Sequence, residues 1–253
     1  MEYLLTYDSL VKTGENSFTT VGDLSKVRDL YGDTDLKLCT DKGFVKVGKV
    51  SQPKIREVYT HVNPYGTKLA FGKVPVSLEF DKPGEMPKFE RVPKCVVYGA
   101  MLSNGGSGKS LKLPMEGCSD FADMLDSLGI QYGFSFLEEN RIGVFNFTMD
   151  CRCFDNPYSL GYDERCCILA GFLSTYPAPY SIDGGIKRRI SRIAVSVGVH
   201  LKFSQRNVEI LQNTDDMTKV MSEGLSMDKL VTVTVEGSED SSLWVDGFFV
   251  KFK

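Results

Sequence analysis

The stretch Leu4–Ser9 (LLTYDS) opens the chain, and two β-prone stretches close it, Thr234–Gly237 (TVEG) and Asp246–Val250 (DGFFV). The first stretch belongs to residues 1 to about 85, where short β-prone runs are separated by turn signals. So many short strands are typical of a barrel or a sandwich. Because residues 226–253 return to the same pattern, the sequence predicts one β domain built from both ends of the chain.

The middle of the chain, from about residue 90 to residue 222, has a different pattern. A stretch rich in Pro and Gly, residues 81–87, reads as a linker before it, and strands such as Gln131–Leu137 lie within it. The sequence therefore predicts a β domain interrupted by an α/β insertion, which is tolerated when the ends of the insertion lie close together. Helices are expected at Lys94–Ser103, Ser119–Leu128, Tyr162–Leu173, Asn207–Asn213 and Asp215–Ser222.

The composition is that of an ordinary globular protein. The chain has 253 residues, of which 42% are hydrophobic and 25% charged, enough for one large domain or two small ones. No apolar run approaches the length of a membrane span, and the first residues lack the basic and apolar regions of a signal peptide. The seven cysteines, an odd number, are expected to be free thiols in a reducing compartment.

The charge balance is slightly acidic, with a net charge of −3 and a pI of about 5.6. A protein whose main task is to bind phosphates usually has a strong basic bias. One basic stretch is present, with six basic residues and one acidic residue over 181–206, whereas residues 109–152 hold four basic and seven acidic residues. A phosphate or RNA contact is one interpretation; we favour a solvated strand face or a surface for an acidic partner. The candidate nucleic-acid-binding residues are Lys187, Arg188, Arg189, Arg192, Lys202 and Arg206.

Other candidate sites have simpler interpretations. Asn104–Ser110 looks like a phosphate-binding loop, but the required first glycine is Ser103 and no helix is expected after it. Cys151-Arg152-Cys153 and Cys166-Cys167 lack the usual zinc spacing, so we favour idle thiols. Trp244 could anchor an interface, but a core position is favoured. We therefore expect no metal and no cofactor.

The two ends of the chain resemble an intein of the Hint family. Leu4–Ser9 resembles the common opening Cys-Leu-Thr-Tyr-Asp-Thr, and the closing stretches resemble the last strands of the family. The resemblance implies an all-β horseshoe. It also implies loss of splicing chemistry, because the reactive residues are replaced. Leu4 takes the place of the nucleophilic Cys, Gly72 and Pro75 take those of Thr and His, and Lys251 and Phe252 take those of the final His-Asn.

The insertion resembles a LAGLIDADG homing endonuclease, whose signature helix occurs twice. Leu169–Pro177 matches the signature over its first five positions, and Val97–Gly105 matches it more loosely. Small residues in both helices would let their backbones approach closely at a pseudo-twofold axis. The resemblance implies an αββαββα domain with an acidic residue near the end of each signature helix. Those positions are Asn104 and Tyr176, so metal binding and hydrolysis are not expected.

The fold class expected is therefore α+β, with a Hint-like β domain at 1–88 and 223–253 and a LAGLIDADG-like insertion at 89–222. The function expected is that of a catalytically inactive, intein-derived protein that serves as a structural or protein-binding component of a larger assembly. The family's association with phages suggests host cytoplasm or a virion. Protein partners are expected, with no membrane and no small-molecule substrate. The alternatives are a freestanding DNA-binding protein, a weak homing endonuclease, or a relic without a role.

Overall fold

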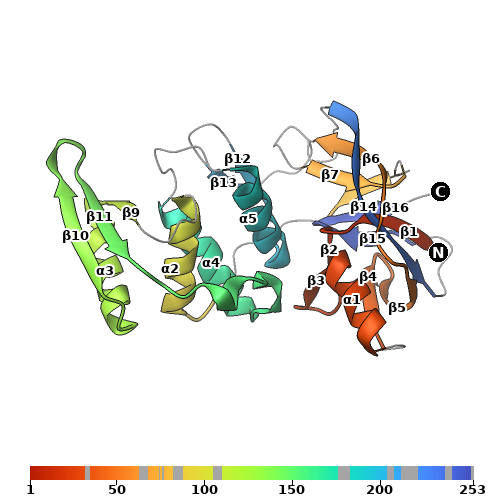
Figure 1. Ribbon diagram of the computed structural model, residues 1–253, viewed down its shortest axis with the longest axis horizontal. Helices are drawn as coiled ribbons and strands as arrows, with labels where there is room; N and C mark the ends of the chain where they lie inside the picture. The colour runs from red at the N-terminus through yellow and green to blue at the C-terminus, as the bar shows by residue number, and fades with distance from the viewer. Residues whose placement is uncertain are drawn as a thin grey trace. The chain divides into compact units, whose positions relative to one another are not determined.

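The chain divides into two compact units, which are described separately (Figure 1). Unit 1 comprises Met1–Gly84 and Leu211–Lys253, and unit 2 comprises Glu85–Ile210. The sequence places the corresponding junctions at 88 and 222. The computed structural model describes residues 1–31, 35–62, 68–73, 75, 77–81, 88–104, 110–175, 183–203, 208–211, 222–236 and 241–251.

Unit 1 is built on antiparallel strands from both ends of the chain, in the order β1-β7-β6-β14-β5-β4-β15-β16-β8, with β2 and β3 attached through β15. Strand β1 pairs with β14 as well as with β7, so the first and last parts of the chain lie side by side. The strands are β1 (Glu2–Thr6), β2 (Leu10–Lys12), β3 (Phe18–Thr20), β4 (Lys37–Thr40), β5 (Gly43–Val50), β6 (Lys54–Val62), β7 (Lys68–Phe71), β8 (Ser77–Phe80), β14 (Ser222–Val235), β15 (Leu243–Val245) and β16 (Phe248–Lys251).

Helix α1 (Val21–Tyr31) lies within this unit, so the all-β structure that the intein resemblance implies for it is wrong at these residues. The helix begins with a reciprocal cap. The Thr20 hydroxyl accepts a hydrogen bond from the Asp23 backbone N–H at 3.1 Å and donates one to the Asp23 carboxylate at 2.9 Å. Such a cap satisfies one of the backbone donors that the first helical turn leaves free. The pattern Thr-x-x-Asp was therefore a local helix signal within a β-rich sequence.

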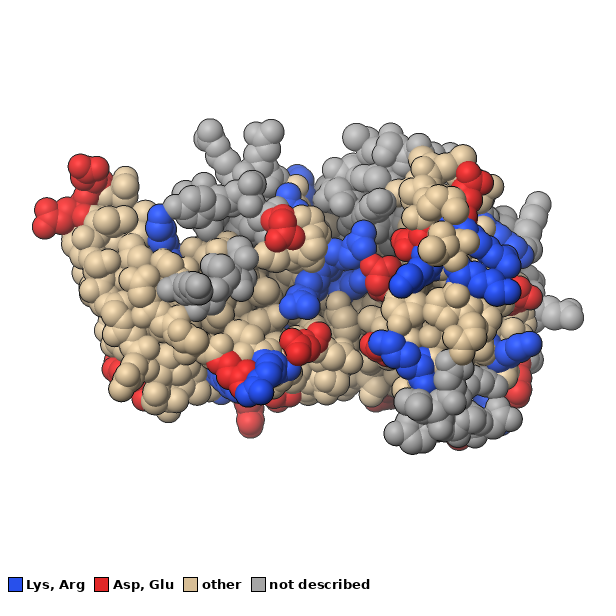
Figure 2. Space-filling model, in the orientation of Figure 1, with Lys and Arg blue, Asp and Glu red and all other residues tan. Residues whose placement is uncertain are grey.

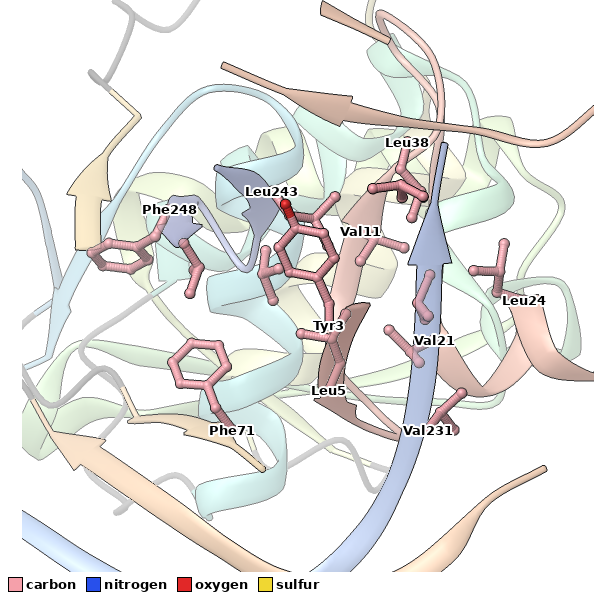
Figure 3. Packing of buried hydrophobic residues seen from close by; sticks show 14 of the residues in the cluster. Tyr3, Leu5, Val11, Val21, Leu24, Leu38, Phe71, Val231, Leu243 and Phe248 are labelled. Carbon is pink, nitrogen blue, oxygen red and sulfur yellow. The ribbon is translucent and has the colours of Figure 1, made fainter. Parts of the chain in front are cut away.

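Alternate residues of β1 carry the core of unit 1. Tyr3 and Leu5 are fully buried and lie opposite Val233 and Val231 of β14. Figure 3 shows Tyr3 and Leu5 packed among side chains from other strands. The Tyr3 hydroxyl donates a hydrogen bond to the Ser241 carbonyl at 2.8 Å, which satisfies its polar end in the core.

Trp244 also belongs to the interior of unit 1. Only 2% of it is exposed, and its indole N–H donates a hydrogen bond to the Asp81 carboxylate at 2.7 Å. Its ring centroid lies 5.4 Å from that of Phe18. The expectation that Trp244 is a core residue is confirmed.

Unit 2 has helices and small antiparallel sheets. Together with unit 1 it confirms the α+β class. In the described ranges, no helix is both long enough and apolar enough to span a bilayer. The helices are α2 (Pro93–Ser103), α3 (Cys118–Ser127), α4 (Tyr162–Thr175) and α5 (Gly184–Ser196), and the strands are β9 (Leu111–Pro114), β10 (Tyr132–Leu137), β11 (Ile142–Phe147), β12 (Leu201–Phe203) and β13 (Val208–Ile210).

The order of these elements differs from the expected αββαββα. The described elements run α2-β9-α3-β10-β11 and then α4-α5-β12-β13, so a second helix precedes each hairpin. A helix was expected at 207–213. This prediction is wrong for Val208–Ile210, which form strand β13 and pair with β12. β-branched Val and Ile favour a strand there. Residues 212–221 lie outside the described residues.

Helix α5 replaces the strand face expected for the basic stretch. The Asp183 carboxylate accepts hydrogen bonds from the backbone N–H groups of Gly185 and Ile186, at 2.7 and 2.9 Å, and so begins the helix. Ile190, Ile193 and Ala194 are buried, which is the spacing of one helical face. The β-branched residues of this stretch favour a strand, but the Asp183 N-cap and the helical spacing of the buried residues favour the helix that is observed.

Candidate functional site

Helices α2 and α4 of unit 2 are in backbone contact at two glycines. A Cβ atom on Gly99 would overlap the Ile168 carbonyl group, and one on Gly171 would overlap the Val96 carbonyl group. Because these neighbours are backbone atoms within helices, they cannot move aside as a flexible side chain would. Only glycine fits at either position, and we call this contact the glycine seam.

The glycine seam is reciprocal. Ile168 lies three residues before Gly171, and Val96 lies three residues before Gly99, so each helix offers the same carbonyl to the glycine of the other. The last turns show the same relation. The hydroxyls of Ser103 and Thr175, each four residues after its glycine, share a hydrogen bond of 2.5 Å. The two helices therefore make matching contacts with each other at the glycines and in their last turns.

The C-terminal ends of these helices carry neutral groups with partners inside the unit. Asn104 donates to the Ser103 hydroxyl at 3.0 Å and accepts a hydrogen bond from the Lys112 backbone N–H at 3.2 Å, which ties α2 to β9. Tyr176, the matching position after α4, lies outside the described residues. Among the residues with described positions, no three or more His, Cys, Asp and Glu side chains gather in a metal-binding arrangement.

In unit 1, two of the positions that the intein resemblance singles out, Leu4 and Gly72, are in contact. The backbone N–H of Gly72 donates a hydrogen bond to the Leu4 carbonyl at 3.0 Å. A Cβ on Gly72 would overlap the Leu4 side chain and would lie 2.8 Å from a methyl carbon of Leu230. Leu4 and Gly72 are therefore neighbours, and the Leu4 side chain fills the space that a side chain at position 72 would need.

The intein resemblance also singles out Pro75, Lys251 and Phe252. Pro75 is a half-buried residue between β7 and β8, and Lys251 ends β16 opposite Ser77 of β8. Phe252 lies outside the described residues. The described contacts therefore place Leu4 beside Gly72 and Lys251 beside β8.

The backbone before Leu4 is part of a regular strand. Tyr3 pairs with Val233 and is fully buried, and the N-terminal ammonium of Met1 donates a hydrogen bond to the Val235 carbonyl at 2.9 Å. Burial raises the pKa of the Tyr3 hydroxyl above its usual value. The peptide bond between Tyr3 and Leu4 is thus held within the sheet, next to a core residue.

The basic residues of α5 are partly used inside unit 2. Arg189 donates a hydrogen bond to the Tyr98 hydroxyl at 2.8 Å, and the Tyr98 ring stacks on Phe154 with centroids 4.1 Å apart. Burial raises the pKa of Tyr98, although Arg189 opposes that shift. The Lys187 ammonium lies 6.0 Å from the centroid of the Phe203 ring, at the outer limit of a cation–π contact.

The remaining basic candidates are more dispersed. Arg188 and Arg192 lie on α5, and Lys202 lies on β12 opposite Glu209 of β13. Arg206 lies outside the described residues. Four of the six basic candidates therefore lie on helix α5, and a fifth, Lys202, lies opposite an acidic residue of the next strand.

The three-stranded sheet of unit 2, formed by β9, β10 and β11, is nearly free of charge. Lys112 is the one charged residue among the described residues of these strands, and Glu138 and Glu139 lie at the turn between β10 and β11. Figure 2 shows a broad uncharged surface over this part of unit 2, with acidic residues at its tip. A sheet that follows phosphates would carry several basic residues.

An apolar surface was missed by the sequence analysis. On the ribbon of β6 and β14, Ile55 is 68% exposed, Leu225 60% and Met227 67%. Tyr59, which is 37% exposed, lies directly opposite Leu225. We call these four residues the β6–β14 patch. The spacing of Leu225 and Met227 indicates that both side chains lie on one face of a strand. The exposure of these side chains and of Ile55 on the paired strand β6 shows that this face is not covered by other described residues.

All seven cysteines are free thiols. Burial, with nearby acidic residues and thiols, raises the pKa of Cys95 to about 12 and that of Cys166 to about 11. Both are therefore protonated at neutral pH, which makes them poor nucleophiles and poor metal ligands. Cys153 is exposed, and Cys167 is buried.

A scan of the chain against protein-family models found no match, and a search of curated proteins found none either.

Proposed function

We propose that this protein is a catalytically inactive descendant of an intein with an inserted LAGLIDADG-type endonuclease. In this proposal it serves as a structural or protein-binding component of a larger assembly, such as a phage or viral particle. The Hint-like and LAGLIDADG-like architectures belong to the same proposal. The β unit built from both chain ends supports the first, and the reciprocal contact of Gly99 and Gly171 supports the second.

The contact between Leu4 and Gly72 carries the proposal. Splicing begins when a nucleophilic side chain attacks the peptide bond before it. Leucine has no nucleophilic atom, and Gly72 has no side chain that could polarise the bond. Burial of Tyr3 keeps that bond within a regular strand, away from the distortion and solvent access that an acyl shift requires.

The ends of the glycine seam support the loss of endonuclease activity. Metal-dependent phosphodiester cleavage needs carboxylates that hold divalent cations between the DNA strands. The described residues at this point are Ser103, Asn104 and Thr175, which are neutral and hydrogen-bonded to one another or to backbone groups. The hydroxyl pair joins the two helices.

The β6–β14 patch supports a protein-binding role. Large apolar side chains that are exposed together are typical of surfaces that another protein covers. Ile55, Leu225 and Met227 are each more than half exposed, although neighbouring residues of β14 such as Leu230 are buried. Keeping such a surface in water without a partner would favour aggregation.

Size analysis of native complexes tests the assembly role. We expect the wild-type chain to migrate with a partner protein, and the double variant Leu225→Lys/Met227→Lys to migrate without it, because two charges would be buried in the contact. Ser226→Lys is the matched control, since Ser226 is exposed on the opposite face of the same strand. A wild-type chain that is a solitary monomer in its native setting would contradict the proposal.

A cleavage assay tests the inactivity separately. Plasmid DNA incubated with the protein and Mg²⁺ or Mn²⁺ should remain uncut, and a tag placed before Met1 should remain attached in the presence of a thiol. Either a specific DNA cut or thiol-dependent release at the Tyr3–Leu4 bond would overturn the claim of inactivity, whatever the result for native complexes.

A further inference from the structure

Strand β10 forms an edge of the three-stranded sheet of unit 2. The sheet has the order β10-β11-β9, and along its outer side β10 has no neighbouring strand in the part of the chain that the structure describes. Six consecutive residues of β10 pair with β11 without a bulge. The outer row of backbone N–H and C=O groups therefore presents a regular template for another strand.

The side chains of β10 lack the usual protection of an edge strand. Tyr132–Leu137 contains no charge and no proline, the two features that most often block further pairing. Phe134 is 47% exposed, Phe136 40% and Leu137 43%. The Phe134 ring contacts Phe145 of β11, with centroids 4.9 Å apart, and its remaining surface is open.

We propose that β10 pairs antiparallel with β10 of a second copy of this chain, around a twofold axis at Ser135, and so forms a continuous sheet across a homodimer. This inference concerns self-association and stands independently of the proposed function. Closed twofold dimers are the commonest symmetric oligomers, and a strand that pairs with its own copy is one way to build them.

The sequence of β10 is complementary to itself around Ser135. In that register, Phe134 of each copy lies opposite Phe136 of the other, which gives two cross-strand aromatic pairs on one face. Ser135 faces its own copy, and Gly133 faces Leu137. The small residues leave room on the second face for the larger leucine.

The self-complementary sequence of β10 favours a second copy over a foreign strand, and the charges beside it do not oppose that pairing. In the proposed register, Glu138 and Glu139 of the two copies lie at opposite ends of the paired strands, so they do not repel each other directly. A foreign strand would have to supply its own apolar match to Phe134 and Phe136, whereas a second copy supplies it by symmetry. The uncharged surface around the sheet in Figure 2 is consistent with close approach of an identical surface.

The full-length protein tests this pairing through charge reversal at the twofold axis. Sedimentation across roughly 1 to 100 µM should show a concentration-dependent dimer. Ser135→Lys and Ser135→Glu should each raise the dimer dissociation constant about fivefold or more, because like charges then face each other. An equimolar mixture of the two variants should restore dimers. Ser127→Lys, at an exposed serine of α3, is the control and should leave dimerisation unchanged.

Cross-linking gives a second readout that does not depend on those variants. A residue that faces its own copy in an antiparallel pair has a Cα separation of about 4.5 to 5.5 Å, which suits a disulfide. Ser135→Cys should therefore cross-link with oxidised glutathione, and Ser127→Cys should not. A wild-type monomer at every concentration, a dimer that both charged variants leave intact, a failure of the mixture to restore dimers, or absence of the Ser135→Cys cross-link would each overturn the inference.

Discussion

At the scale of single residues, Gly72 and Leu4 share one space. A Cβ on Gly72 would overlap the Leu4 side chain, so each residue limits what the other can be. The sequence resemblance singled out both positions because reactive residues were missing there. The resemblance did not predict that the Leu4 side chain would fill the space left by the missing side chain of Gly72. That fit depends on the pairing of β1 with β7.

We expect Gly72→Ala to destabilise unit 1 by about 1 to 3 kcal/mol through overpacking against Leu4. In the Leu4→Ala background, the same change should cost less, with a coupling energy on the order of 1 kcal/mol. Trp244, the single tryptophan of the chain, is buried in unit 1, so its fluorescence during urea unfolding reports on this unit. Strictly additive effects would show that the two positions are not in contact.

His200 is a buried residue of unit 2 whose protonation should affect stability. It is 5% exposed, and burial lowers the pKa of its imidazole to about 3, from an ordinary value of 6.5. Between these pH values the unfolded chain binds a proton that the folded chain does not. The contribution of neutral His200 to stability is therefore complete above pH 6.5 and is lost as the pH falls toward 3.

The wild-type protein should lose up to about 1.4 kcal/mol of stability per pH unit through His200 as the pH falls below 6.5. Carboxylates also respond to acid, so the variant His200→Gln isolates the effect. Urea unfolding followed by circular dichroism, between about pH 7 and pH 5, should give a shallower pH dependence for this variant. Equal slopes for the two proteins would mean that His200 is protonated in the folded state.

At the scale of elements, some helices were predicted from the sequence and others were missed. Helices α2 and α4 were predicted from their apolar pattern, and the glycines in them correctly indicated a close approach. Helices α1 and α5 were missed, although each begins with a side-chain cap, at Thr20 and Asp183, that is visible in the sequence. β-branched residues in both stretches masked these local signals.

The glycine seam gives a sharp test at this scale. Ala normally stabilises a helix by about 1 kcal/mol relative to Gly. In Gly171→Ala the new methyl would overlap the Val96 carbonyl, so we expect a loss of about 3 kcal/mol instead. Gly184→Ala in α5 is the matched control, because a Cβ atom at this position would meet no described atom within 4 Å, and the change should be neutral or stabilising. Urea unfolding followed by circular dichroism measures both.

An unchanged midpoint for Gly171→Ala would show that the two helix backbones do not touch.

The paired hydroxyls of Ser103 and Thr175 were also missed, although the spacing that relates Gly99 to Gly171 relates these residues too. Once Gly99 and Gly171 are known to be in contact, the equal separation of Ser103 and Thr175 along the chain indicates that these two residues are also near each other. The hydrogen bond itself depends on the crossing of the two helices, which the sequence does not specify.

At the scale of the whole molecule, charge separates the two functions considered. The net charge is −3, and the four basic residues of α5 belong to a unit whose three-stranded sheet is nearly uncharged. A duplex-binding protein releases counterions as it neutralises phosphates, so its affinity falls steeply with salt. Arg189 is held by the Tyr98 hydroxyl, which leaves fewer basic groups to contact DNA.

We therefore expect weak binding to a duplex of arbitrary sequence, with an affinity that changes little between about 50 and 200 mM salt. Fluorescence anisotropy of a labelled duplex measures this dependence, and the variant Arg188→Ala/Arg192→Ala shows whether α5 contributes. A slope of log affinity against log salt steeper than about −4 would require several phosphate contacts. If the same slope became shallower in the variant, α5 would be a nucleic-acid interface, and the DNA-binding alternative would replace the structural role. A flat dependence in both proteins fits a surface whose basic residues serve packing within unit 2.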